Sequence, residues 1–256
     1  MKVISALSLA GGQGKTTSMI LLAKQLSEKG KRVLVIDADP QSNLTFFLGL
    51  EPSDQDPTLL EVLKGTIETE DGIYPTEDKN LFIIPSDRGL ASVGEYLSSS
   101  GTGAFVLKLR LKSVETLFDY VLVDVQPSRS QISLTAVGAT DLALIPAETT
   151  TKGVNSLFDT LSFLDNQKQL MAFNGEVLGV IPFRDRWVGV NQTKDSRDSV
   201  EAMKEIAEGI RIFSSLRESE KFKTAIRQNQ TLSQLGYPDL EHPFQEIVRV
   251  LEESYE

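Results

Sequence analysis

The sequence predicts an α/β fold with a doubly wound, mostly parallel sheet that carries helices on both faces. Short apolar runs alternate along the chain with helix-like segments. The runs are rich in Val, Ile and Leu and lack polar alternation, which is typical of strands buried on both faces. The chain has 256 residues, of which 40% are hydrophobic, and this length allows a substantial core. We therefore expect a single domain over residues 1–256.

Seven runs are candidate strands and six segments are candidate helices. The strands are expected at residues 3–9, 32–37, 80–85, 120–125, 142–147, 176–183 and 209–213. The helices are expected at residues 15–30, 90–97, 105–117, 153–170, 199–208 and 242–253. The first helix places Met19, Leu22 and Leu26 on one stripe, and Gly30 suits the position that follows a helix end.

Composition excludes several classes of function. The net charge of −10 argues against a protein that binds nucleic acid over its whole surface. The absence of cysteine excludes disulfides, thiol catalysis and iron–sulfur clusters. No apolar run approaches the ~20 residues of a membrane span, and the segment "EIVRVLEESYE" is too acidic for anionic lipid. We expect a cytoplasmic protein that does not bind membranes.

The stretch "AGGQGKTT", residues 10–17, follows the first strand and opens the first helix. Its glycines let the backbone approach a phosphate group, and the helix N-terminus adds partial positive charge. Lys15 is expected to reach the β- and γ-phosphates, and the Thr16 hydroxyl to coordinate Mg²⁺. The alternative is a turn that needs glycine for tight geometry only. The predicted nucleotide-binding residues are Gly11, Gly12, Gln13, Gly14, Lys15, Thr16 and Thr17.

Aspartates follow two of the candidate strands. Asp124 lies in "YVLVDV", which places a carboxylate at the carboxyl edge of the sheet, where an acid linked to Mg²⁺ must lie. Asp37 ends the strand expected at residues 32–37 and Asp39 follows it, and we expect their carboxylates to point differently. Asp39 is the better candidate for positioning the attacking water. An acid that only caps a helix or a turn is the alternative for Asp39.

Three motifs resemble those of the ParA/MinD family of deviant Walker ATPases. "AGGQGKTT" is similar to the family's K-G-G-x-G-K-T-T, "DADPQSN" to D-x-D-P-Q-x-N, and "DVQPSRS" to D-x-P-P-S. The similarity continues through "NLFIIPSDRGLASVGEYL" and "DLALIPAETT", so it covers most of the chain. The resemblance implies a P-loop NTPase fold of the deviant Walker type. It also implies an ATP-dependent homodimer that binds a surface, and a partner protein that triggers hydrolysis.

The chain departs from the family pattern at Ala10, where the family has a lysine that reaches the phosphates of the partner subunit. Our hypothesis is that Lys152, which follows "LALIPAETTT" at the same edge of the sheet, takes this catalytic role; a solvated lysine is the alternative. The missing loop lysine makes the chain resemble the carboxysome-positioning subgroup, McdA. That subgroup distributes carboxysomes over the nucleoid with a small adaptor protein.

The resemblance further implies contacts with non-specific DNA and with adenine. The basic residues of "SSLRESEKFKTAIRQNQ" lie where ParA relatives contact DNA, although a solvated charged face is the alternative. They are Arg217, Lys221, Lys223 and Arg227. "PFRDRW" matches the adenine-side loop of the family, so Pro182 and Phe183 are candidates to flank the base, although apolar residues ending a strand are more often core. The role of Trp187 stays open.

The leading hypothesis is a dimerising ATPase, associated with the nucleoid, that uses ATP and Mg²⁺ and positions carboxysomes through an adaptor. A plasmid or chromosome partition ATPase is the alternative within the family. A metabolic P-loop ligase or kinase is the alternative from another class, and its turnover would require a small molecule. A third alternative is a scaffold that binds ATP and dimerises but has lost hydrolysis.

Overall fold

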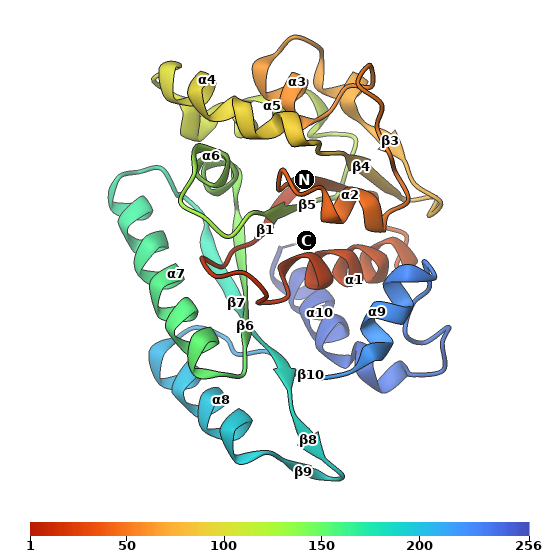
Figure 1. Cartoon of the computed structure of the whole chain (residues 1–256), viewed down its shortest axis with the longest axis vertical. Helices are drawn as coiled ribbons and strands as arrows, with labels where there is room; N and C mark the ends of the chain where they lie inside the picture. The colour runs from red at the N-terminus through yellow and green to blue at the C-terminus, as the bar shows by residue number, and fades with distance from the viewer. Residues whose placement is uncertain (256) are drawn as a thin grey trace.

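The structure is a computed structural model that describes residues 1–255 (Figure 1). Eight strands form one sheet in the order β10-β7-β6-β1-β5-β2-β4-β3. Neighbouring strands are parallel except for β3 and β4, which are antiparallel. The strands are β1 Lys2–Ala6, β2 Val33–Ala38, β3 Tyr74–Pro75, β4 Leu81–Ile84, β5 Tyr120–Val125, β6 Leu142–Glu148, β7 Glu176–Asp185 and β10 Leu216–Arg217, with a separate hairpin of β8 Trp187–Val188 and β9 Asn191–Gln192.

Helices cover both faces of this sheet, which confirms the predicted doubly wound α/β class. One face is covered by α3 Leu59–Lys64, α4 Val93–Ser99, α5 Val106–Leu111, α6 Gln131–Ala139, α7 Thr151–Gln169 and α8 Lys194–Ile206. The other face is covered by α1 Lys15–Glu28, α2 Asn43–Phe47, α9 Glu220–Arg227 and α10 His242–Tyr255. Among residues 1–255, no helix is both long and apolar enough to cross a membrane.

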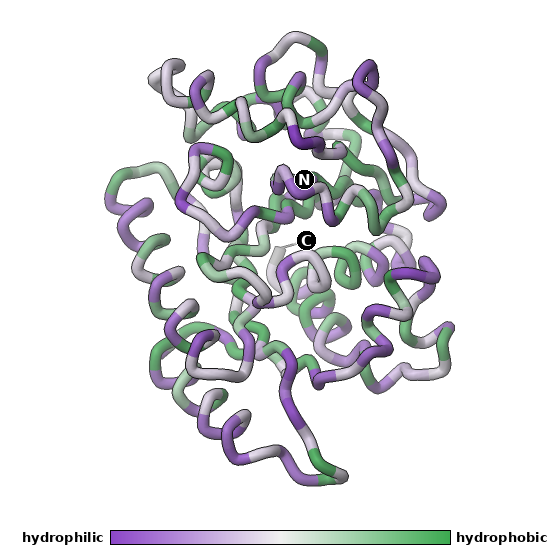
Figure 2. The backbone as a smooth tube through the Cα atoms, in the orientation of Figure 1, coloured by the Kyte–Doolittle hydropathy of each residue, from purple (hydrophilic) through white to green (hydrophobic). Residues whose placement is uncertain are grey.

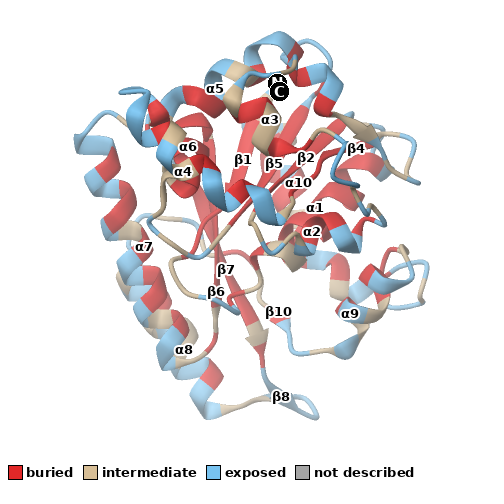
Figure 3. Cartoon of the chain, turned by 45° about the horizontal axis from the view of Figure 1, so that its top comes forward, coloured by how far each residue is buried: buried red, intermediate tan, exposed pale blue. Residues whose placement is uncertain are grey.

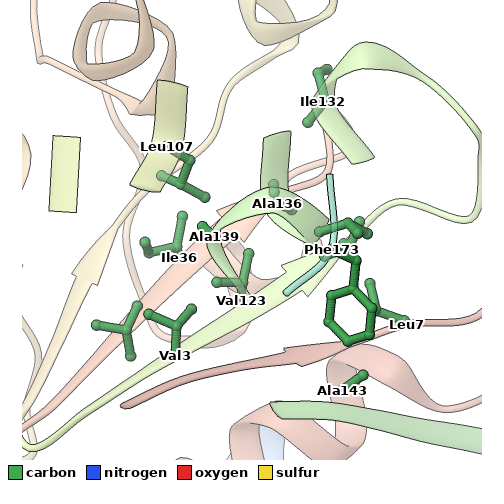
Figure 4. Close-up of a cluster of buried hydrophobic side chains, with 14 of the residues drawn as sticks. Val3, Leu7, Ile36, Leu107, Val123, Ile132, Ala136, Ala139, Ala143 and Phe173 are labelled. Carbon is green, nitrogen blue, oxygen red and sulfur yellow. The ribbon is translucent and has the colours of Figure 1, made fainter. Parts of the chain in front are cut away.

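Alternate side chains of the central strands supply the two cores. On β1, Val3 belongs to the core beneath α3 to α8, whereas Ile4 belongs to the core beneath α1, α9 and α10. Figure 4 shows part of the first core, where Val3, Val123 and Ala143 come from neighbouring strands and Ala136 comes from α6. Hydrophobic residues follow the strands in Figure 2, and Figure 3 shows these strands buried beneath helices whose outer surfaces are exposed.

The strand order places the predicted phosphate loop at the centre of the sheet. β1 lies between β5 and β6, and the chain builds the sheet outward from it on both sides. Such a point is where ligands bind in open α/β sheets, outside the carboxyl ends of the strands. Asp37 and Asp124 are register partners on β2 and β5, and Ala6 pairs with Asp124. The candidate acids therefore lie beside the loop that follows β1.

The structure differs from the predicted elements in several places. The run at residues 209–213 is not a strand: Ile212 makes one isolated bridge to Val180, and β10 follows at Leu216–Arg217. Gly179 explains the close approach there, because an added Cβ would lie 2.5 Å from the Phe213 ring. Four helices were not predicted, namely α2, α3, α6 and α9. They are short, from 5 to 9 residues, so apolar periodicity had little length in which to show.

Candidate functional site: a phosphate loop at the centre of the sheet

The turn between β1 and α1 requires glycine at two positions. Gly12 has φ +83° and Gly14 has φ +92°, a region that L-residues with side chains rarely adopt. Gly14 is also the N-cap of α1, so the loop leads directly into the first turn of that helix. The unpaired N–H groups of a helix N-terminus favour a bound anion. The loop therefore has the backbone geometry that phosphate binding needs.

Gly14 is further constrained by the β7 strand. A Cβ at this position would lie 2.7 Å from the ring of Phe183, which is closer than real Cβ contacts. We expect Gly14→Ala to destabilise the nucleotide-free protein by about 2–4 kcal/mol, from backbone strain and overpacking together. Urea unfolding measures this change. Gly11→Ala is the matched control, because its φ is not positive and its Cβ would find Pro127 Cγ at 3.9 Å. Equal stability of the two variants would contradict the prediction.

Lys15 begins α1 and its side chain is buried. Its Nζ lies 3.4 Å from the carbonyl oxygen of Ala10, within the same loop. Burial lowers the pKa of Lys15, and the nearby carboxylates of Asp124 and Asp39 partly oppose that shift. The ammonium group is thus held inside the loop, close to two of the candidate acids.

Thr16 and Asp124 meet directly. The Thr16 hydroxyl donates a hydrogen bond of 2.6 Å to Asp124 Oδ2. Asp124 Oδ1 is buried and has no hydrogen-bond partner among residues 1–255. Burial, followed by the charge of Asp37, raises the pKa of Asp124 to about 7. An oxygen without a partner beside a hydroxyl suits Mg²⁺, which prefers hard oxygen ligands. No group of three acidic, histidine or cysteine side chains that could hold a metal ion is found among residues 1–255.

Asp37 and Asp39 do point differently. Asp37 is fully buried, and its Oδ2 accepts hydrogen bonds from both the N–H and the hydroxyl of Thr45, each at 2.8 Å. Burial nevertheless raises the pKa of Asp37 to about 6. Asp39 is only half-buried, and its carboxylate accepts a hydrogen bond from the N–H of Gln41 at 2.9 Å. Asp37 therefore anchors α2, whereas Asp39 stays accessible beside Lys15.

Lys152 reaches the phosphate loop in this structure. It lies in the first turn of α7, and its exposed Nζ donates a hydrogen bond of 3.0 Å to the carbonyl oxygen of Gly11. Gly11 neighbours Ala10, the position at which the resemblance implied a missing lysine. The two segments are 141 residues apart in the sequence, and the sheet brings them together.

The remaining candidates, in the phosphate loop and in the segment expected to contact adenine, differ in their burial. Thr17 is half-buried and lines a cavity of about 640 Å³ together with Phe46 and Phe47 of α2. Pro182 and Phe183 are both buried, and Phe183 packs under Gly14. Trp187, at the start of the β8–β9 hairpin, donates a hydrogen bond of 2.9 Å from Nε1 to Asp185. The assignment of Pro182 and Phe183 to adenine stays a prediction.

The four basic candidates divide into two pairs. Lys223 and Arg227 are exposed on α9 and line the same cavity as Thr17. Arg217 and Lys221 instead lie over aromatic rings. The Arg217 guanidinium is 4.4 Å from the centre of the Trp187 ring, and Lys221 Nζ is 4.6 Å from that of Tyr237. Lys223 and Arg227 thus lie on an exposed face, where Lys223 Nζ pairs with Glu220 Oε1 at 2.9 Å, whereas Arg217 and Lys221 lie against aromatic rings of the same chain.

Sequence reasoning did not identify several residues that build the site. Thr45 donates to Asp37, the Glu148 N–H donates to Gln13, and Arg184 donates to the Glu148 carboxylate. Each is a common polar residue, and the contacts of Glu148 with Gln13 and of Arg184 with Glu148 join residues that are 135 and 36 positions apart in the sequence. Only the positive φ of Arg184, +55°, marks it as unusual, and this too is a property of the folded chain.

Comparisons with known proteins show the family to which the chain belongs. Residues 1–172 match the family model described as AAA domain. The Maintenance of carboxysome distribution protein A of Gloeothece citriformis (strain PCC 7424) is 54% identical over 251 residues, which cover 98% of this chain and 97% of that protein. A structure of a Cyanothece McdA variant in complex with ATP has a TM-score of 0.96 and 53% identity, and covers 98% of this chain and 96% of that one.

A more distant structure shares the fold. Cobyrinic acid a,c-diamide synthase from Mycobacterium smegmatis, with a bound ATP analogue and magnesium, has a TM-score of 0.78 and 25% identity over 89% of this chain and 92% of that one. The family model, the full-length relative and the deviant Walker motifs lead to one assignment. The chain belongs to the AAA-domain family and, within it, to the ParA-like ATPases that include the maintenance of carboxysome distribution protein A.

Proposed function

We propose that residues 1–256 form a single ParA-like ATPase domain that positions carboxysomes on the nucleoid. With ATP bound it dimerises and binds non-specific DNA, and an adaptor protein stimulates hydrolysis and release. The observation that carries this proposal is the similarity over 98% of the chain to the carboxysome distribution protein of Gloeothece. The proposal places the protein in the cytoplasm, associated with the nucleoid.

The site residues divide the work of ATP hydrolysis. The loop glycines and the N-terminus of α1 would hold the phosphates, and Lys15 would neutralise the β- and γ-phosphates. Thr16 and Asp124 would hold Mg²⁺, which neutralises charge on the phosphates when it is bound. Asp39, accessible beside Lys15, would orient the attacking water. In nucleotide-free protein, Asp124 binds a proton below a pH of about 7, the value of its raised pKa.

Lys152 would supply the cation that the family's loop lysine supplies. In the free chain its Nζ rests on the carbonyl oxygen of Gly11, at the entrance to the phosphate loop. We propose that in the ATP dimer this side chain turns to the γ-phosphate of the partner subunit. A cation supplied across an interface in this way raises hydrolysis rates by about 10³–10⁵ in related enzymes.

Lys223 and Arg227 are the residues that support DNA binding best, because they are exposed side by side on α9. A monomer with few phosphate contacts would bind weakly, and affinity would fall steeply with salt. A dimer presents two such faces, so the second contact becomes intramolecular and avidity rises. This arrangement would make DNA binding depend on ATP without any readout of base sequence.

The test is binding to non-specific duplex DNA with ATP, with ADP and without nucleotide, alongside light scattering for mass. We expect binding only with ATP, together with a doubled mass. A double variant, Lys223→Ala with Arg227→Ala, should weaken binding at least ~10-fold and flatten the salt dependence. Lys204→Ala, an exposed lysine on α8, is the control. Absence of DNA binding at low salt in every nucleotide state would contradict the proposal.

A metabolic P-loop enzyme is the second candidate, because the fold is shared with cobyrinic acid a,c-diamide synthase, whose structure holds an ATP analogue and magnesium. That function predicts ATP turnover that depends on a small-molecule acceptor and not on DNA or an adaptor. Measuring ATP hydrolysis with and without DNA, in the absence of any small-molecule acceptor, separates the two candidates. Hydrolysis under these conditions favours the positioning ATPase.

A further inference from the structure

Gln13 connects the phosphate loop to the strand that leads to Lys152. Its side chain is fully buried, with 0% exposure. Its Oε1 accepts a hydrogen bond of 2.8 Å from the backbone N–H of Glu148, near the end of β6. Glu148 precedes Lys152 by four residues. One end of the segment that carries Lys152 is therefore attached to the loop.

The segment between Glu148 and Lys152 has little freedom. The N–H of Thr150 donates to the carbonyl oxygen of Glu148 at 2.7 Å, and Thr150 Oγ1 caps α7 by accepting from the N–H of Gly153 at 3.3 Å. A Cβ at Gly153 would lie 1.9 Å from the Glu148 carbonyl oxygen, so the turn is as tight as glycine permits. The position of Glu148 therefore sets where α7 begins and where the Lys152 side chain leaves it.

The last residues of β7 hold the same segment from the other side. Arg184 Nη1 lies 3.0 Å from Glu148 Oε1. The N–H of Thr149 donates to the Phe183 carbonyl oxygen at 2.9 Å, and its hydroxyl donates to that of Arg184 at 3.0 Å. Glu148 is thus held between the phosphate loop and β7.

Burial of the Gln13 side-chain amide costs free energy that packing alone does not explain. Its Nε2 is buried and has no hydrogen-bond partner among residues 1–255. A buried polar group without a partner destabilises the folded state, a cost that an apolar side chain of similar size avoids. The contact made by Oε1 therefore serves more than the filling of space.

We propose that Gln13 is a positioning residue for Lys152: through Glu148 it holds the start of α7 in register with the phosphate loop. This inference rests on the proposed catalytic role of Lys152. Gln13 itself need not touch the nucleotide. Its contribution is to limit the places that the Lys152 ammonium group can reach, and pre-organisation of this kind acts on the rate of the chemical step.

Gln13→Met tests the proposal, because methionine fills a similar volume without an acceptor for the Glu148 N–H. We expect kcat for ATP hydrolysis to fall about 10-fold or more, while the dissociation constant for ATP stays within about 3-fold. In a Lys152→Ala background, Gln13→Met should change kcat no further, since residues that act as a unit are not additive. Gln13→Asn, which draws the amide oxygen back from Glu148, is a second variant with the same expected result.

Ser8→Ala is the matched control. Ser8 Oγ lies 2.9 Å from Ser156 Oγ, so this pair also joins the β1 side of the loop to α7, about one turn beyond Lys152. Its loss should leave kcat within about 2-fold. Equal falls in kcat from Gln13→Met in both backgrounds, or weakened ATP binding with unchanged kcat, would overturn the role of Gln13 alone. A wild-type kcat for Lys152→Ala would overturn the role of Lys152 and this inference with it.

Discussion

Lys152→Ala is expected to lower kcat for ATP hydrolysis by about 10³-fold or more while ATP binding changes little. The expected size follows from in-trans arginine fingers, which contribute about 10³–10⁵ in rate. The effect should lie in kcat, because Lys15 and the loop glycines still hold the nucleotide. The loss of one exposed hydrogen bond to Gly11 should change the free energy of unfolding by less than about 1 kcal/mol.

Single-turnover hydrolysis and equilibrium binding of a fluorescent ATP analogue measure the two quantities separately. Lys168→Ala removes an exposed lysine from the last turn of the same helix and should behave as wild type. Ala10→Lys in the Lys152→Ala background restores a lysine at the family's usual position and is expected to recover at least 10-fold of the lost rate. Full activity of Lys152→Ala would contradict the catalytic role and would show that Lys152 is a solvated lysine.

Asp124→Asn is expected to abolish ATP hydrolysis and, at pH 8, to stabilise the nucleotide-free protein. Activity should fall at least ~10³-fold, because an amide replaces the carboxylate that would hold Mg²⁺. Stability should rise because the wild type buries a carboxylate whose Oδ1 has no partner among residues 1–255. Asparagine can still accept the hydrogen bond from Thr16, and it places an uncharged NH₂ group where the unpaired oxygen was.

The pH dependence of this effect has a definite sign. The pKa of Asp124 is raised from 3.8 to about 7, so the folded state binds the proton more tightly than the unfolded chain does. The stability of the wild type should therefore fall as pH rises from about 4 to about 7, and stay level above that. Each pKa unit corresponds to about 1.4 kcal/mol, so the variant should gain on the order of 1–3 kcal/mol at pH 8 and almost nothing near pH 4.

Urea unfolding across this pH range, without nucleotide, measures the difference. Asp141→Asn is the control, since Asp141 lies at the opposite edge of the sheet and accepts a hydrogen bond of 2.9 Å from the N–H of Val3. It should keep both the activity and the pH profile of the wild type. A variant of Asp124 that is less stable than wild type at pH 8, or that still hydrolyses ATP, would contradict the prediction.

Local patterns in the sequence were sufficient for most of the sheet and for the glycine-rich turn between β1 and α1. Six of the seven candidate strands match β1, β2, β4, β5, β6 and β7, because fully buried strands are continuous apolar runs. The strand predicted at residues 209–213 was wrong, because β10 begins three residues after that run ends and pairs with β7 through Leu216 and Arg217. The helix α6 was missed because Gln131–Ala139 is rich in small and β-branched residues and shows no amphipathic stripe.

The sequence by itself determined the fold class and the glycine-rich loop after the first strand. It also placed Lys15, Thr16, Asp39 and Asp124 near the ends of predicted strands, since each of these features depends on residues close together in the chain. Tertiary structure alone decided which distant side chains meet. It placed Lys152 on the Gly11 carbonyl oxygen and Gln13 on the Glu148 N–H, contacts that span 141 and 135 residues. Such contacts depend on the strand order around β1, and local sequence patterns do not determine which strands become neighbours.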